Sequence, residues 1–408
     1  MSITNKLKKK LFYFSVSLLP KPLRHGFYRK NYARVPSAVP AGLTFELART
    51  KEELEAAFKL LHDAYVEQGF ITPHPSGMRL IIQHALPTTS ILVAKMNHQV
   101  IGTISIMRDT ALGLPMEKVF DINHLKKNGK RVAELSCLAI HPNFRRNMGG
   151  HIFFPLTLFA SMFAERSFGT DYLVWNLYPQ HADFYNAIFG SSHLSQEAKD
   201  YLGAPASAIQ LDLAGSYNFA KQKYQGLGIK KDLFKYTYVT KHSYFKYPLV
   251  EDGSINHPVM TPAIFEYFFS QKTDILKNLS ALEEQVVARY YPLSSYAAVI
   301  PINKFKIEEP RSNIRWDTRL TAHLKDKASV TVLDISESGF RAYAPEDLVL
   351  YRTYEFEIKL DSGEKVIIKA KPIWKKTDSV YGFKLLEANK IWERLVENQA
   401  SKLKQLVS

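Results

Sequence analysis

The chain has 408 residues and carries 54 Lys and Arg against 39 Asp and Glu, which gives a formal net charge of +15. A chain of this length is longer than one that ordinarily forms a single hydrophobic core, so two or three domains are predicted. Its content of 46% hydrophobic and 12% aromatic residues excludes extended disorder. The single cysteine, Cys137, excludes an intrachain disulfide and favours a reducing, cytoplasmic setting. The positive charge predicts an anionic partner, and the lack of zinc-finger spacing or an aromatic RNA-binding signature argues against nucleic acid.

Residues 1–40 form a basic N-terminal segment that ends in a proline-bounded linker, 36–40. Its apolar stretch, 11–19, has nine residues, whereas a membrane span needs about 20. Two interpretations stay open. The segment is either a basic amphipathic helix that lies on a membrane surface or an acidic partner, or a helix packed on the body of the protein.

Residues 41–210 alternate between strand and helix patterns and are predicted as one α/β domain. The predicted elements are a strand at 43–48, a helix at 51–65, a hairpin of 91–95 and 99–108, a strand at 131–140, a basic glycine-bearing loop at 144–150, a helix to about 167, a strand at 171–178 and a short helix at 181–190.

This order of elements resembles the GNAT acyltransferase fold and, within it, the N-acyl amino acid synthases, relatives of the acyl-homoserine lactone synthases. The residues that carry the resemblance are 63–71, 134–142 with Arg145 and Arg146, and 181–185. It implies transfer of an acyl group from a pantetheine thioester to an amine. Glu134 would then be the general base that accepts the ammonium proton, and Tyr185 would protonate the leaving sulfur. The alternatives are an exposed or salt-bridged strand glutamate and a tyrosine that only packs in the core.

A basic loop precedes the long helix and resembles the phosphate-binding loop of that fold. Arg145 and Arg146, with backbone N–H groups that include those of Gly149 and Gly150, would bind a pantetheine phosphate at the helix start. An ordinary solvated arginine pair is the alternative. The loop departs from the usual pattern because it ends in His151 and is soon followed by a proline. These departures favour acyl carrier protein over coenzyme A as the donor.

Residues 211–307 are predicted as a mixed, largely helical extension and connector. Thr261 and Pro262 have the side chains expected at the N-cap and first position of a helix. The aromatic run that follows, 265–269, is interpreted as core rather than as a lipid site.

Residues 308–408 combine two short motifs with strand patterns at 328–335, 353–360, 364–376 and 379–386 and a closing helix at 389–406. The motifs are R-x-x-x-R, at Arg311 and Arg315, and D-x-S-x-x-G, at Asp334, Ser336 and Gly339. In this order they resemble the PilZ domain, a small antiparallel β-barrel that binds cyclic di-GMP.

The residue types suit that ligand. Arginine forks bind phosphate or a guanine edge, and Asp334 and Ser336 can meet guanine N–H donors. Gly339 is expected to allow a positive φ or close approach of the ligand.

Together these features predict a cyclic di-GMP-regulated N-acyltransferase, with no metal, that moves a long acyl chain to the amine of an amino acid. The predicted location is the cytoplasm, with peripheral contact at the inner face of the membrane as an option. Two alternatives remain: a non-catalytic, nucleotide-responsive adaptor with a degenerate acyltransferase fold, and plain coenzyme A-dependent N-acetylation.

Overall fold

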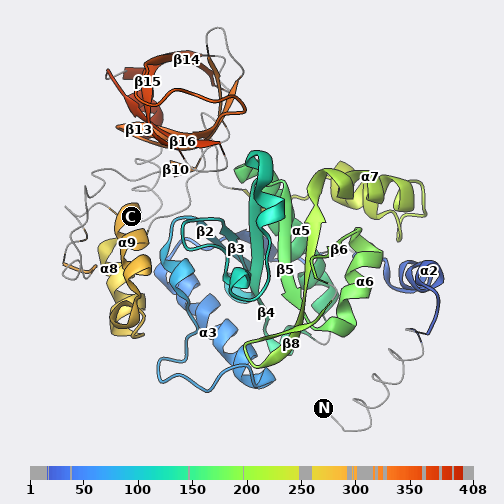
Figure 1. Ribbon diagram of the computed structural model, residues 1–408. Coiled ribbons are helices and arrows are strands. Elements are labelled where there is room, and N and C mark those ends of the chain that lie inside the picture. The colour runs from blue at the N-terminus through green and yellow to red at the C-terminus, as the bar shows by residue number, and fades with distance from the viewer. Residues whose placement is uncertain are drawn as a thin grey trace.

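The structure is a computed structural model of the chain, in which an α/β part and a smaller β-barrel are joined by a helical connector (Figure 1). It describes residues 16, 18–36, 39–145, 148–195, 197–247, 260–291, 296, 298–300, 316–317, 320–324, 329–360, 364–375, 379–387 and 390–397.

A nine-stranded mixed sheet forms the centre of the α/β part. Along one path its order is β6 (Ser192–His193), β8 (Ala204–Asp212), β5 (Tyr172–Leu177), β4 (Val132–Ile140), β3 (Gln99–Arg108), β2 (Thr89–Met96), β1 (Leu43–Leu47) and β9 (Phe245–Lys246), and β7 (Lys199–Tyr201) pairs with β8. The hairpin of β2 and β3 is confirmed. The sequence analysis missed β6 to β9, since three of these strands are only two or three residues long.

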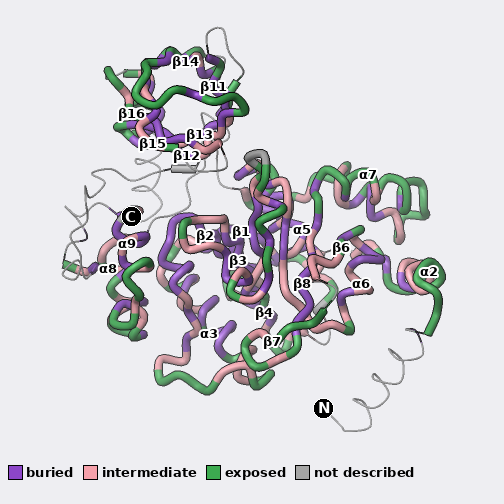
Figure 2. The backbone as a smooth tube through the Cα atoms, in the orientation of Figure 1, coloured by how far each residue is buried: buried purple, intermediate pink, exposed green. Residues whose placement is uncertain are grey.

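Helices cover both faces of this sheet. On one face α3 (Lys51–Gln68) packs Leu60 and Leu61 against a core that includes Val174, and on the other α5 (Gly149–Phe168) packs Phe159 and Phe163 against a core that includes Phe45. Buried positions accordingly concentrate in the strands and on the inward sides of these helices (Figure 2). The result is the layered α/β architecture that the sequence predicts.

Local sequence sets where these helices begin and end. Thr50 and Glu53 form a capping box at the start of α3, and Gly69 ends it with a left-handed φ of 76°. Pro155 lies inside α5, past its first turn, rather than at its start. The hydroxyl of Thr157, two residues on, donates to the carbonyls of Phe153 and Phe154 and so occupies carbonyls next to the proline.

The described part of the N-terminal segment packs on the body of the protein. Helix α2 (Lys21–Tyr32) contacts α6 (Pro179–Phe189), where Asp183 pairs with both Arg24 and His25 and the ring of Tyr28 is buried. Of the two interpretations of this segment, packing is the one seen for 21–32. Residues 1–15 lie outside the described part. None of the described helices has the length and apolarity to cross a bilayer.

The connector contains α8 (Pro262–Glu266), a π-helical turn (Tyr267–Gln271) and α9 (Ala281–Tyr290). Thr261 caps α8 as expected, because its hydroxyl accepts from the N–H of Ile264. Phe265, Phe268 and Phe269 are fully buried. The aromatic run is therefore core.

The C-terminal part is a closed antiparallel barrel of six strands in which β13 pairs back to β12. Its strands are β11 (Thr321–Leu324), β12 (Val330–Ser336), β13 (Gly339–Tyr343), β14 (Tyr354–Lys359), β15 (Lys365–Lys375) and β16 (Val380–Leu385), and β10 (Trp316–Asp317) adds to β12. Residues 390–397 are helical and bury Trp392 and Leu395. The indole of Trp392 donates to the carbonyl of Ser336 at 3.0 Å. The predicted barrel and its closing helix are thus present, although β10, β11 and β13 were not anticipated.

Candidate active site and barrel site

A cavity of about 420 Å³ opens where β4 and β5 separate. The two strands pair only from Val132 to Glu134, opposite Tyr172 to Val174, and their later residues line the cavity. A bulge in β4 follows, at which Cys137 has a φ of 58°. The cavity is within the size range of small-molecule sites. Apolar side chains of α5 and α7 (Leu213–Tyr224) form much of its far wall, among them Phe153, Leu158, Met162, Phe219 and Ala220.

Glu134 lines this cavity from the last paired position of β4. Only 1% of its surface is exposed, and its Oε2 accepts from the N–H of Met116 at 2.8 Å. Burial raises the pKa of Glu134 to about 8, against the opposing hydrogen bonds from Met116 and Ser136. No ion pair involves it among the described residues. The exposed and salt-bridged alternatives are therefore wrong, and the group has a pKa suited to exchanging a proton near neutral pH.

Tyr185 of α6 lines the same cavity. Its ring also makes edge contacts with Phe153 and Trp175 and a tilted contact with Phe189. The structure thus brings the two predicted catalytic residues to one cavity, and it also shows the aromatic packing that was the alternative for Tyr185.

Arg145 of the basic loop already makes contacts within the protein, whereas a side chain free to bind phosphate was expected. Nη1 of Arg145 pairs with Glu67 at 2.8 Å and its Nε donates to the carbonyl of Ile140 at 3.0 Å. Gly149 begins α5, and the space beside Gly150 is open. Arg146 lies outside the described residues, so its predicted role stays a prediction.

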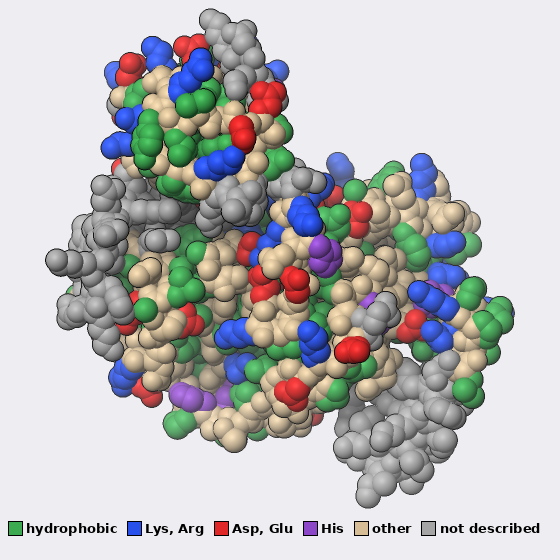
Figure 3. Space-filling model, viewed as in Figure 1, with side chains coloured by type: hydrophobic (Ala, Val, Ile, Leu, Met, Phe, Trp, Pro, Cys, Tyr) green, Lys and Arg blue, Asp and Glu red, His purple; other side chains and the backbone are tan. Residues whose placement is uncertain are grey.

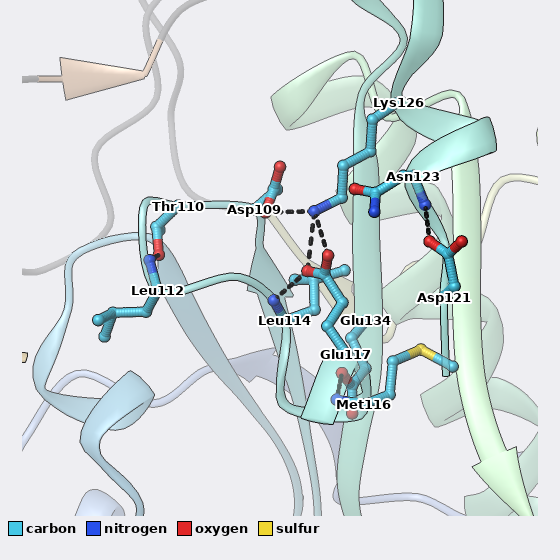
Figure 4. Close-up of polar contacts among 10 residues, drawn as sticks. All are labelled: Asp109, Thr110, Leu112, Leu114, Met116, Glu117, Asp121, Asn123, Lys126 and Glu134. Carbon is cyan, nitrogen blue, oxygen red and sulfur yellow. Dashed lines mark hydrogen bonds and ion pairs between the residues drawn. The ribbon is translucent and has the colours of Figure 1, made fainter. Parts of the chain in front are cut away.

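A polar cluster that the sequence analysis did not find lies over Glu134 (Figure 4). The ammonium of Lys126 contacts Asp109 at 2.9 Å and both oxygens of Glu117 at 2.7 and 2.8 Å. Glu117 accepts from the N–H of Leu114 in the same turn from which Met116 donates to Glu134. Burial lowers the pKa of Lys126, but the two carboxylates outweigh it and raise that pKa. Only the folded loop brings these residues together, which is why spacing did not reveal them.

In the barrel, the D-x-S-x-x-G motif makes internal contacts. Asp334 is buried and pairs with Nε of Arg341 at 2.6 Å, and the hydroxyl of Ser336 donates to the carbonyl of Gly339 at 3.0 Å. Gly339 has no left-handed φ. A Cβ there would lie 2.0 Å from the carbonyl oxygen of Phe383, so the neighbouring strand is what requires glycine. The expectation of a positive φ at Gly339 is wrong. Arg311 and Arg315 lie outside the described residues.

The barrel touches the α/β part beside the polar cluster. Nη2 of Arg131 donates to the carbonyl of Val332 in β12 at 2.9 Å, while its Nη1 donates to the carbonyl of Phe168. Burial raises the pKa of Asp109, and Lys126 and, least of all, Arg341 oppose that shift. This contact places the strand that carries Asp334 next to the loop that holds Glu134.

Within the described ranges, no three or more His, Cys, Asp or Glu side chains lie together so that they could hold a metal ion.

Comparisons with known proteins match the α/β part of the chain. Residues 56–212 match the family model described as N-acyl amino acid synthase FeeM. Among solved structures, the N-acyl amino acid synthase FeeM from uncultured soil microbes is 22% identical, with a TM-score of 0.36, over 43% of this chain and 93% of that one. The coenzyme A-dependent acyl-homoserine lactone synthase BjaI is 16% identical, with a TM-score of 0.38, over 51% of this chain and 96% of that one.

A third solved structure, the inhibitor of motility MotI/DgrA of Bacillus subtilis, is 14% identical, with a TM-score of 0.22, over 26% of this chain and 56% of that one. No curated protein matches. The matched residues include strands β4 and β5, which border the cavity. The N-terminal part of the chain thus contains an N-acyltransferase domain.

Proposed function

We propose that this chain is a cyclic di-GMP-regulated N-acyltransferase that moves a long acyl group from acyl carrier protein to the amine of an amino acid. The observation that carries the catalytic half is the buried Glu134 in the wall of a largely apolar cavity. A carboxyl group with a pKa of about 8 takes up a proton near neutral pH, and an apolar cavity accepts a hydrocarbon chain.

In the proposed reaction, Glu134, Tyr185 and solvent carry all the protons that are transferred. The ammonium of the acceptor gives one proton to Glu134, and the free amine attacks the thioester carbonyl. The C–N bond forms and the C–S bond breaks as the tetrahedral intermediate collapses. Tyr185 donates its hydroxyl proton to the leaving sulfur and regains a proton, through solvent, from the nitrogen that becomes the amide. Glu134 then releases its proton to solvent, which restores the starting state.

One feature of the described surface favours acyl carrier protein as the donor. Helices α2 and α7 both contact α6, and they carry exposed basic side chains, seen at one end of the molecule in Figure 3. The exposed lysines of this end are Lys21, Lys30, Lys221, Lys223 and Lys230. An acidic carrier domain would complement them.

Regulation is proposed to pass through the contact between the barrel and the loop. A nucleotide bound by Arg311, Arg315, Asp334 and Ser336 would compete with Arg341 for Asp334. The freed guanidinium would then act more strongly on Asp109 and so on the cluster that positions Met116. The nucleotide changes activity only through its different affinities for the two arrangements.

The test of catalysis uses the purified full chain with acyl carrier protein or coenzyme A carrying short, medium or long acyl groups, and a panel of amino acids. N-acyl amino acids detected by mass spectrometry, and lost in Glu134→Gln, support the enzyme. No product from any donor, with or without cyclic di-GMP, favours the non-catalytic adaptor. Preference for acetyl-coenzyme A would instead support plain N-acetylation.

The test of the sensor is calorimetry with cyclic di-GMP. Arg311→Ala and Arg315→Ala should abolish binding and leave the fold intact, because each removes a charged fork for the phosphates or guanine edges. Arg352→Ala, at an exposed arginine of the same barrel, is the matched control and should bind normally. Unchanged affinity in the two motif variants would refute the sensor.

A further inference from the structure

The cavity continues past the reacting groups along helix α5. The side chains of α5 that line it follow one another at helical spacing from Phe154 through Leu158 to Glu165, so they belong to one face of the helix. Eleven residues separate the ends of this face, which corresponds to about 16 Å at the rise of an α-helix. The hydroxyls of Thr157 and Ser161 on this wall donate to carbonyls of α5 itself, so neither needs a ligand.

Helix α7 forms a second wall of this part of the cavity. Its lining side chains include Leu213, Ser216, Ala220 and Tyr224, which again share one face. Eleven residues also separate the ends of this face, so the two walls have nearly the same length of about 16 Å. The family match ends at residue 212, directly before α7. The wall that α7 adds therefore lies outside the matched part of the chain.

One end of the slot between α5 and α7 lies beside the reacting groups. The hydroxyl of Tyr224 donates to the carbonyl of Ile188 at 2.8 Å, and the next residue, Phe189, stacks on Phe154. The ring of Phe189 also contacts that of Tyr185, the proposed donor to the leaving sulfur, with centroids 5.7 Å apart. We therefore expect the thioester carbonyl at this end, with the acyl chain extending from it into the slot.

Polar groups gather at the other end of the slot. The hydroxyls of Ser216 and Tyr238 lie 2.8 Å apart, and Tyr238 belongs to the π-helical turn Lys235–Val239. Burial raises the pKa of Tyr238, Ser216 opposes that shift, and the exposed Glu165 adds to it. The last lining residue of α5 thus lies near this hydroxyl pair. A hydrocarbon tail gains nothing from two hydroxyls bonded to each other or from a carboxylate, so these groups mark the far limit of its path.

We propose that α7 limits the length of the acyl group, and that Ala220 and Ser216 are the residues that set this limit. An extended hydrocarbon chain advances about 1.25 Å per carbon, given C–C bonds of about 1.5 Å, so a slot of about 16 Å holds about 13 carbons. This inference rests on the proposed function and names the class of acyl group. Each methylene within the slot should raise kcat/KM for the donor about 4-fold, and methylenes beyond it should add nothing.

The experiment uses the full chain, an amino acid that the wild type acylates, and acyl carrier protein loaded with saturated acyl groups of about 4 to 18 carbons, a range that extends past the capacity of the slot on both sides. The readout is the ratio of kcat/KM for each donor to that for the shortest donor, so a uniform loss of activity cancels. In the wild type this ratio should rise up to about 13 carbons and then stop rising.

Two variants fill the slot at different depths. Ala220→Leu lies four residues, or about 6 Å, from Tyr224 and should stop the rise at about 5 carbons. Ser216→Leu lies four residues further along α7 and should stop it at about 10 carbons. A general defect in folding or catalysis would not separate the two limits by about 5 carbons.

Ala214→Leu is the matched control, because Ala214 is exposed on α7 and does not line the cavity. It should keep the wild-type profile. The same limit in the wild type and both slot variants would overturn the inference, and so would limits in the reverse order. Either result would leave the enzyme standing. Wild type that forms no N-acyl amino acid from any donor would instead refute the proposed function.

Discussion

Replacing Glu134 by Gln should make the protein inactive and at the same time more stable at alkaline pH. The pKa of Glu134 is raised from 4.5 to about 8 by burial at 1% exposure. A carboxyl group with a raised pKa binds its proton more tightly in the folded chain, so its contribution to stability is full below pH 4.5 and is lost as the pH rises through about 8. That interval of 3.5 pH units, at 1.36 kcal/mol each, amounts to roughly 5 kcal/mol as an upper bound. Gln keeps the shape and an acceptor for the N–H of Met116 but does not titrate.

Urea unfolding at pH 6 and pH 9 samples the part of this interval from pH 6 to about 8, which amounts to about 3 kcal/mol of that upper bound. The free energy of unfolding of the wild type should fall between the two pH values by more than that of Glu134→Gln, because only the wild type must bury a charge at pH 9. The change in the variant reports all other titrating groups, so the difference between the two proteins isolates Glu134.

Activity should rise with pH as Glu134 loses its proton, whereas stability falls. At pH 7 about a tenth of Glu134 is ionised if its pKa is about 8, so kcat/KM for the acceptor should rise with pH and level off above that value. Equal pH dependence of stability in wild type and Glu134→Gln would refute the raised pKa. Full activity of Glu134→Gln would refute its role as the base.

Other perturbations test the loop and the barrel. Lys126→Met leaves Asp109 and Glu117 facing each other without a cation, and it should destabilise the protein by about 3 kcal/mol in urea unfolding and lower kcat more than the KM values. The control is Lys277→Met, which removes the exposed ion pair with Asp274 and should change the free energy of unfolding by less than about 1 kcal/mol. Equal losses of unfolding free energy in the two variants would contradict a stabilising role for the Lys126 cluster. Gly339→Ala forces a Cβ against the carbonyl of Phe383 and should destabilise the barrel by about 1–3 kcal/mol or more, which a lower melting temperature would show. Gly150→Ala is the control, because it has open space at its Cβ and should leave the melting temperature unchanged. An unchanged melting temperature for Gly339→Ala would show that β13 and β16 separate easily.

The amino-acid sequence by itself determined the elements whose patterns are long and regular. The 18-residue helix α3 shows its apolar period and its capping box, and the hairpin of β2 and β3 shows two largely apolar runs on either side of a short turn. The same holds for β14 and β15, in which buried and exposed positions alternate. In these segments local propensity and burial favour the same structure.

Only the tertiary structure decided which groups face one another. Strands β6 and β9, of two residues each, have no pattern of their own and exist because a neighbouring strand offers unpaired backbone groups. The state of Glu134 depends on the separation of β4 from β5 and on a loop that donates from Met116. Desolvation and charge depend on the distances that the complete fold imposes, so spacing along the chain could suggest Glu134 but neither its pKa nor its neighbours.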